Sequence, residues 1–175
     1  SVSAGIVSEP TVRGSISPIN TDQRFAGPDA PAYKDHVLLR FWEGAKKQTA
    51  PTLFVRLGTD GIGLASGVPL SGALRDRWRT AVAADAGAEV ATILDALAAG
   101  GCEVAGDLLA KVPRPHDADH PRAELLRRTG GLQVRKLHDL PAVEGVGAFA
   151  DETAKLLGDF VDLHRWLVTH IEAAS

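Results

Sequence analysis

The densest group of chemically capable side chains lies in a loop-like segment near the amino terminus. It contains Asp22, Arg24, Tyr33, Lys34 and His36 within fifteen residues. Arginine and lysine offer hydrogen-bond donors that suit phosphate and carboxylate groups, so this density is typical of a pocket for an anion. The alternative is a loop held together by Asp–Arg pairs, in which the polar residues only shape the backbone.

A second polar group, His116-Asp117-Ala118-Asp119-His120, lies in the other half of the chain. Histidine and carboxylate groups are good ligands for zinc or manganese, but this spacing matches no standard metal motif. One short loop cannot easily aim all four side chains at a single ion, so we expect no metal site here. We expect instead that Asp119 or His120 lies near the cap of a short helix that follows.

Two further motifs predict no chemistry. Cys102 is the only cysteine and has no catalytic signature around it, so an unreactive thiol is expected. A single free thiol also favours a reducing compartment, and we expect a cytoplasmic location. The glycine-rich stretch over residues 58–67 does not match G-x-G-x-x-G and opens no helix, so it is not a phosphate loop. We therefore expect no cofactor.

Composition limits the partners of the chain. It has 175 residues with 22 acidic and 19 basic side chains, a formal net charge of -3. There is no overall positive field to hold nucleic acid, and the basic residues between 122 and 136 have no interleaved aromatic residue for base stacking. The sequence lacks an apolar run of about 18 residues, so no membrane span is expected. The length indicates one domain over residues 13–175, preceded by a flexible arm over residues 1–12.

Both strands and helices are predicted to position these residues. Residues 36–44 and 132–138 have strand patterns, and 52–59 with 62–68 predict a hairpin that turns at Asp60-Gly61 in a type I′ geometry. Helices are predicted from Ser71 onward, over 88–99, over 121–129 with a stop at Gly130-Gly131, and over 149–173. The expected fold is α+β: a mixed or antiparallel sheet with helices packed on it and a long carboxy-terminal helix.

Both polar segments carry a resemblance to a known family. Asp22-Gln23-Arg24-Phe25, with Asp29 and Tyr33-Lys34, resembles the signature R-x-x-R-D-x-R-F-x-x-x-[D/N]-K-x-x-Y of the conserved hypothetical bacterial family called domain of unknown function 2461. Downstream, Lys111-Val112-Pro113, Asp119-His120-Pro121 and Glu124–Arg127 resemble its second motif. The two leading arginines of the first motif are replaced by Pro18 and Thr21. The resemblance implies a soluble, cytoplasmic α+β domain and no particular reaction.

Three functions are compatible with these patterns. The first is a ligand-binding or non-catalytic domain for a small anionic ligand. Its polar site would combine Arg24, Tyr33 and Lys34 with Asp119, His120 and Arg127, because a partly buried Arg24 needs a distant carboxylate. The second is a hydrolase or transferase in which His120 and Asp119 act as acid and base on an anionic substrate. The third is a protein-interaction module that uses the carboxy-terminal helix and Trp166. The oligomeric state is not predicted.

Overall fold

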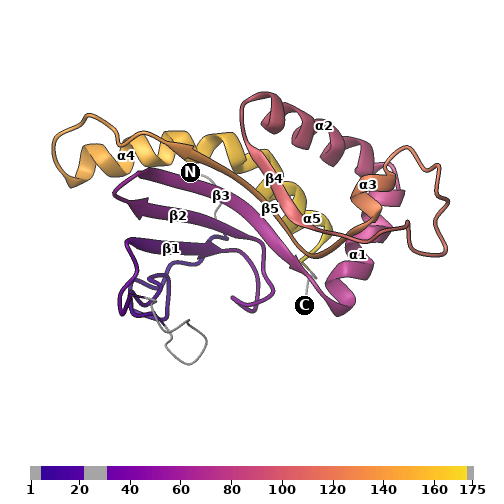
Figure 1. The fold of residues 1–175 in the computed structure, drawn as a ribbon, viewed down its shortest axis with the longest axis horizontal. Coiled ribbons are helices and arrows are strands. Elements are labelled where there is room, and N and C mark those ends of the chain that lie inside the picture. The colour runs from indigo at the N-terminus through magenta and orange to yellow at the C-terminus, as the bar shows by residue number, and fades with distance from the viewer. Residues whose placement is uncertain (1–4, 22–30, 173–175) are drawn as a thin grey trace.

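A single antiparallel sheet of five strands organises the molecule (Figure 1). The computed structural model describes residues 5–21 and 31–172. The strand order is β1-β2-β3-β5-β4, and every neighbouring pair is antiparallel, which confirms the predicted α+β class. The strands are β1 (His36–Trp42), β2 (Thr52–Gly58), β3 (Gly61–Leu70), β4 (Glu103–Leu108) and β5 (Arg128–His138).

The predicted hairpin is present, but its turn differs from the expected one. Gly58 pairs with Gly61, so the loop residues are Thr59 and Asp60, one position earlier than predicted. Neither loop residue has a positive φ, which a type I′ turn requires at both central positions. The positive φ of +137° is at Gly61, where a Cβ atom would lie 2.3 Å from the carbonyl oxygen of His138. Glycine is therefore needed for the close approach of β5.

The helices follow the predicted pattern with two differences. They are α1 (Gly72–Ala83), α2 (Ala86–Ala99), α3 (Ala123–Leu126), α4 (Val146–Leu157), a 3-10 turn η1 (Gly158–Phe160) and α5 (Val161–His170). The long carboxy-terminal helical segment is confirmed, although it starts at Val146 and η1 divides it. The helix predicted over 121–129 spans only four residues, and β5 already begins at Arg128. Gly130 and Gly131 therefore do not end the helix; they pair with β3 inside β5.

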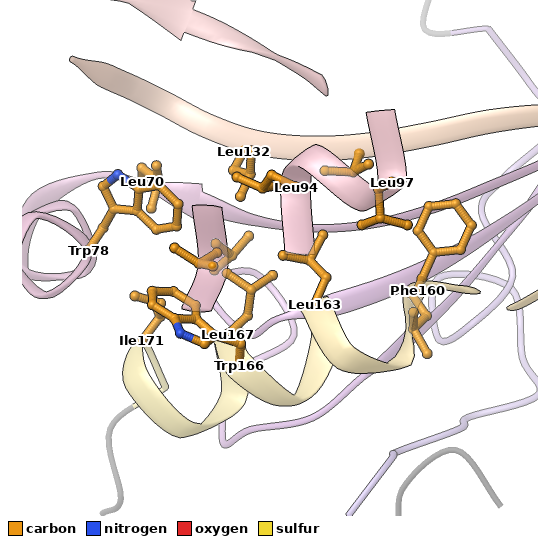
Figure 2. Packing of buried hydrophobic residues seen from close by; sticks show 14 of the residues in the cluster. Leu70, Trp78, Leu94, Leu97, Leu132, Phe160, Leu163, Trp166, Leu167 and Ile171 are labelled. Atoms are coloured by element: carbon orange, nitrogen blue, oxygen red, sulfur yellow. The ribbon is translucent and has the colours of Figure 1, made fainter. Parts of the chain in front are cut away.

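The two faces of the sheet have different surroundings. Alternating residues of β2, β3 and β5 form the core with α1, α2 and α5, and Figure 2 shows the side chains of α2 and α5 meeting there. Trp166 lies in this core: its ring meets Trp78 edge-on at 5.7 Å, and its Nε1 donates to the Ala86 carbonyl at 3.0 Å. Because Trp166 is only 3% exposed, it is not available to build an interface.

The amino-terminal segment lies along the outer edge of β1. Ser17 donates its backbone N–H to the Leu38 carbonyl, and the Ser15 carbonyl accepts from the Arg40 N–H. Val7 donates to the Trp42 carbonyl in the same way, so the predicted arm contacts the sheet from that residue. Its flexibility stays a prediction. Within residues 5–21 and 31–172, no helix combines the length and apolar character that crossing a membrane requires.

A buried histidine lies where α5 meets the loop after β1. The side chain of His164 is completely buried, and its Nε2 lies 3.3 Å from Oε2 of Glu43. Its Nδ1 has no hydrogen-bond partner. Burial lowers the pKa of His164 below the usual 6.5, because desolvation of the charged ring outweighs the opposing effect of the Glu43 carboxylate. The folded protein therefore favours the neutral ring.

We expect the free energy of unfolding to fall as the pH drops below 6.5, the ordinary pKa of the histidine in the unfolded chain. The unfolded chain then binds a proton before buried His164 does, so this contribution is complete above pH 6.5 and is lost progressively below it. Urea unfolding on both sides of that pH measures the effect. His164→Asn should flatten the decline, whereas His170→Asn, on the same helix, should keep it. An equally steep decline in His164→Asn would contradict this account.

Candidate functional site

The face of the sheet opposite the core carries two adjoining cavities. Small residues of β3, namely Gly63, Ala65 and Gly67, line them beside larger side chains from the neighbouring strands. The cavity volumes are about 390 and 570 Å³, within the range of sites for small molecules. Both are lined by Phe54 of β2 and Gln133 of β5, so they are neighbours, and the two together are called here the sheet-face groove.

Arginine side chains reach this groove from three different strands. The register places Arg40 opposite Phe54, Phe54 opposite Ala65, and Ala65 opposite Arg135, in one row across the sheet. Arg56 lies in the next row, opposite Gly63. Successive strand residues point to opposite faces, so the apolar neighbours of these arginines enter the core while the guanidinium groups stay on the open face.

Two of the three arginines are already paired. Arg135 holds Glu103 with two hydrogen bonds of 2.9 and 2.8 Å, and Arg56 Nη1 donates to Asp60 at 2.7 Å. These hydrogen bonds hold the pKa of Glu103 and that of Asp60 below their usual values. Both carboxylates are thus ionised at neutral pH and neutralise part of the charge on the face.

Arg40 differs from the other two. Its guanidinium carbon lies 5.9 Å from the centre of the Phe54 ring, a cation–π distance. Its Nε is shielded from solvent and has no hydrogen-bond partner. Within the described part of the chain, no carboxylate lies within salt-bridge distance of Arg40. It can therefore offer charged donors to a ligand in the groove.

The first predicted segment adjoins one end of this face. His36 Nδ1 lies 2.7 Å from Oδ1 of Asp35, which also lies 4.0 Å from Arg56. Lys34 donates to the Pro18 carbonyl at 3.0 Å, and Tyr33 is 63% exposed. The pKa of Asp35 is lowered, mainly by its hydrogen bond to His36. Asp22 and Arg24 lie outside the described residues, so the predicted Arg24–Asp119 contact stays a prediction.

The second predicted segment has local structural contacts. His120 Nδ1 accepts the backbone N–H of Arg122 at 3.0 Å, just before α3, so the expected position near the helix cap is confirmed for this residue. Arg127 Nε donates to the Leu109 carbonyl at 2.6 Å, and Asp119 is exposed. Among residues 5–21 and 31–172, no three His, Cys, Asp or Glu side chains cluster closely enough to hold a metal ion.

The sheet keeps the described parts of the two segments apart. His36 pairs with Gly58 at the end of the sheet where the hairpin turns. The second segment belongs to the connection from β4 to β5, which leaves and re-enters at the opposite end, where Leu108 pairs with Arg128. Figure 1 shows the chain before β1 at the lower left and this connection at the far right. Tyr33 and His120 therefore do not meet in one site.

The groove residues were missed although their pattern is visible in the sequence. Three strands contain an apolar residue followed by an outward arginine, in Leu38-Leu39-Arg40, Phe54-Val55-Arg56 and Gln133-Val134-Arg135. Alternation alone identifies each arginine as outward-facing. Alternation does not show which strands are neighbours in the sheet. The strand order is what brings the guanidinium groups to one surface.

The sheet, with helices on one face and the groove on the other, defines an α+β domain. A family model described as conserved hypothetical protein (DUF2461) matches residues 2–166, and the chain belongs to this family. The match confirms the family named from the two motifs and extends beyond the residues that carried them. No curated protein and no solved structure matches the chain.

Proposed function

We propose that the chain is a ligand-binding domain whose sheet-face groove takes a small anionic compound with a flat, apolar part. The observation that carries this proposal is Arg40, which lines a ligand-sized cavity, has a shielded and unpartnered Nε, and has no acidic partner among residues 5–21 and 31–172. A carboxylate or phosphate would supply the acceptors that its donors lack. A cytoplasmic location, consistent with the single free thiol, is part of the same proposal.

The groove also supplies an apolar contact for such a ligand. Phe54 borders both cavities, and the small β3 residues leave room for a flat group against the sheet. Aromatic rings stack on flat groups, and this stacking adds to the energy of burial. Phe54 would orient the ligand while Arg40 binds its negative group. Among the described residues of the polar site predicted from the 22–36 and 116–127 segments, His36 adjoins the groove, through Asp35 and Arg56.

The enzyme alternative has less support. It requires His120 as an acid or base beside Asp119, but the imidazole Nδ1 is engaged with the backbone before α3. That contact favours a structural role for His120. The interaction-module alternative depends on Trp166, whose burial removes its apolar surface from contact with a partner. Binding without catalysis is therefore the function that we propose.

The proposal predicts saturable binding of phenyl phosphate, measured by titration of backbone amide resonances. Shifts should map to the strands around the groove. Arg40→Gln should weaken binding about tenfold or more, because hydrogen bonds to a charged group contribute roughly 1.5–3 kcal/mol and a factor of ten corresponds to about 1.4 kcal/mol. Phe54→Leu should weaken phenyl phosphate more than inorganic phosphate.

The matched control is Arg165→Gln, which removes a largely exposed arginine on α5, away from the groove. It should bind phenyl phosphate as the native protein does. Equal affinities for the Arg40 and Arg165 variants would reject the assigned role of Arg40. An absence of saturable shifts in the native protein would reject this ligand class.

A further inference from the structure

One arginine on the helical side of the molecule, Arg128, is buried without adequate partners. The side chain of Arg128, at the start of β5, is only 4% exposed. Its Nε is shielded and unpartnered, and its Nη1 donates one hydrogen bond of 3.3 Å to the Ala105 carbonyl. The nearest carboxylate oxygen, from Glu124, lies 3.7 Å from Nη2, beyond hydrogen-bond distance. A guanidinium carries five N–H donors, and the Nε donor has no acceptor here.

This shortage of partners needs a physical explanation. Removing a charged group from water is costly unless the protein supplies hydrogen bonds or an opposite charge. Burial lowers the pKa of Arg128 because Glu124 compensates only in part for the lost water. Glu124 is itself 70% exposed, so its carboxylate is largely hydrated rather than committed to Arg128. A small group that binds beside Arg128 would provide the missing acceptors.

Space for such a group is present. Arg128 lines a cavity of about 390 Å³ between α2, α3 and β4, separate from the sheet-face groove. Its other charged lining residues are Arg122, Asp95 and Glu124. Both acidic residues are exposed, whereas Arg128 is buried. Leu94, Val104 and Leu125 provide apolar walls.

We propose that this cavity binds a small zwitterion, such as an amino acid, with its carboxylate on Arg128 and its ammonium group between Asp95 and Glu124. Two basic and two acidic side chains balance one another around the cavity, so the ligand that they favour carries both charges. Arginine accepts a carboxylate in a two-point geometry that uses several donors at once. A simple anion would be repelled by the two carboxylates that line the cavity and would bind less well. The proposal is independent of the one for the sheet-face groove.

The first experiment uses the native chain and three probes: glycine, acetate and methylammonium. Amide resonances of Asp95, Glu124 and Arg128 are followed during each titration. We expect saturable shifts with glycine and affinities at least about tenfold weaker for the two singly charged probes, because each lacks one charged contact. Acetate binding as tightly as glycine would overturn the zwitterion assignment. No saturable shift at these amides with any probe would overturn the site.

Two variants separate binding from structure. Arg128→Met should fold, keep or raise its melting temperature and lose glycine binding, because an apolar side chain removes an undercompensated buried charge. Asp95→Asn should weaken glycine and leave acetate unchanged or tighter, while Asp162→Asn on α5 is the matched control. The proposal is rejected, and Arg128 is a structural residue, if two results occur together: Arg128→Met has a lower melting temperature, and Asp95→Asn binds glycine as the native protein does. If Arg128→Met does not fold, the native titrations and Asp95→Asn still decide it.

Discussion

Replacing Phe160 by alanine is expected to lower the free energy of unfolding by roughly 3–5 kcal/mol, the usual range for a buried phenylalanine. Phe160 ends η1, the turn that joins α4 to α5, and none of its surface is exposed. Figure 2 shows its ring beside Leu97 and Leu163, from α2 and α5. Truncation removes contacts with both helices and leaves a cavity that close-packed neighbours fill only in part. Urea unfolding monitored by circular dichroism measures the change.

Phe149→Ala provides the matched control for this experiment. The same atoms are removed, but Phe149 on α4 is only partly buried against the core. Its loss should therefore cost less than the loss of Phe160, because fewer contacts and less apolar area disappear. Equal losses for the two variants would show that burial at Phe160 does not determine its contribution.

Arg122→Met should lower the free energy of unfolding by about 1.5–3 kcal/mol, the range for hydrogen bonds to a charged group. The Nε of Arg122 donates to the Val82 carbonyl at 2.7 Å, and Nη2 donates to the carbonyls of Ala83 and Ala84 at 3.1 and 3.0 Å. The last carbonyls of a helix have no partner within the helix, and a cation at that end also interacts favourably with the helix dipole. Arg122 thus holds the second predicted polar segment, residues 116–127, against the end of α1.

Arg165→Met is the comparison for this change. Its guanidinium is largely exposed and lies 4.0 Å from Asp162, so its removal should cost less than about 1 kcal/mol. Gly87→Ala tests the same contact from the other side, because a Cβ there would lie 2.6 Å from Arg122 Nε and 1.9 Å from the Val82 oxygen. Both Arg122→Met and Gly87→Ala should be destabilised. Native stability in either would contradict the capping role.

Local patterns predicted most of the elements, and long-range pairing accounts for the differences. The strand at 36–44 and the hairpin were readable because alternation and a short loop are local properties. Gly130 and Gly131 read as a helix stop, yet they pair with Leu70 and Pro69 in β3. Strand pairing outweighs the weak strand propensity of glycine, since propensity depends on context in sheets. No local signal in the sequence reveals that partner.

The candidate site was less predictable than the fold. The two polar segments share residue types that suit one site, but residue type does not encode at which end of the sheet a loop lies. The described part of the first segment lies beside the hairpin turn, and the second lies at the opposite end. The groove is assembled from strands that are distant in sequence, with Arg40 and Arg135 separated by β2 and β3. Each arginine can be identified from the sequence as outward-facing. Only the order of the strands shows that the three arginines lie on one surface.

The two edge strands of the sheet are protected against pairing with strands of other copies of the chain. Exposed strand edges promote aggregation, because their free backbone groups can pair with another chain. At β1 the chain's own residues 15–17 occupy that position. At β4 the register shifts between Ala105 and Asp107, and Gly106 has a φ of +135° that breaks the regular ladder. With acidic Glu103 and Asp107 on the same short strand, neither edge offers a flat template for a polymer of strands.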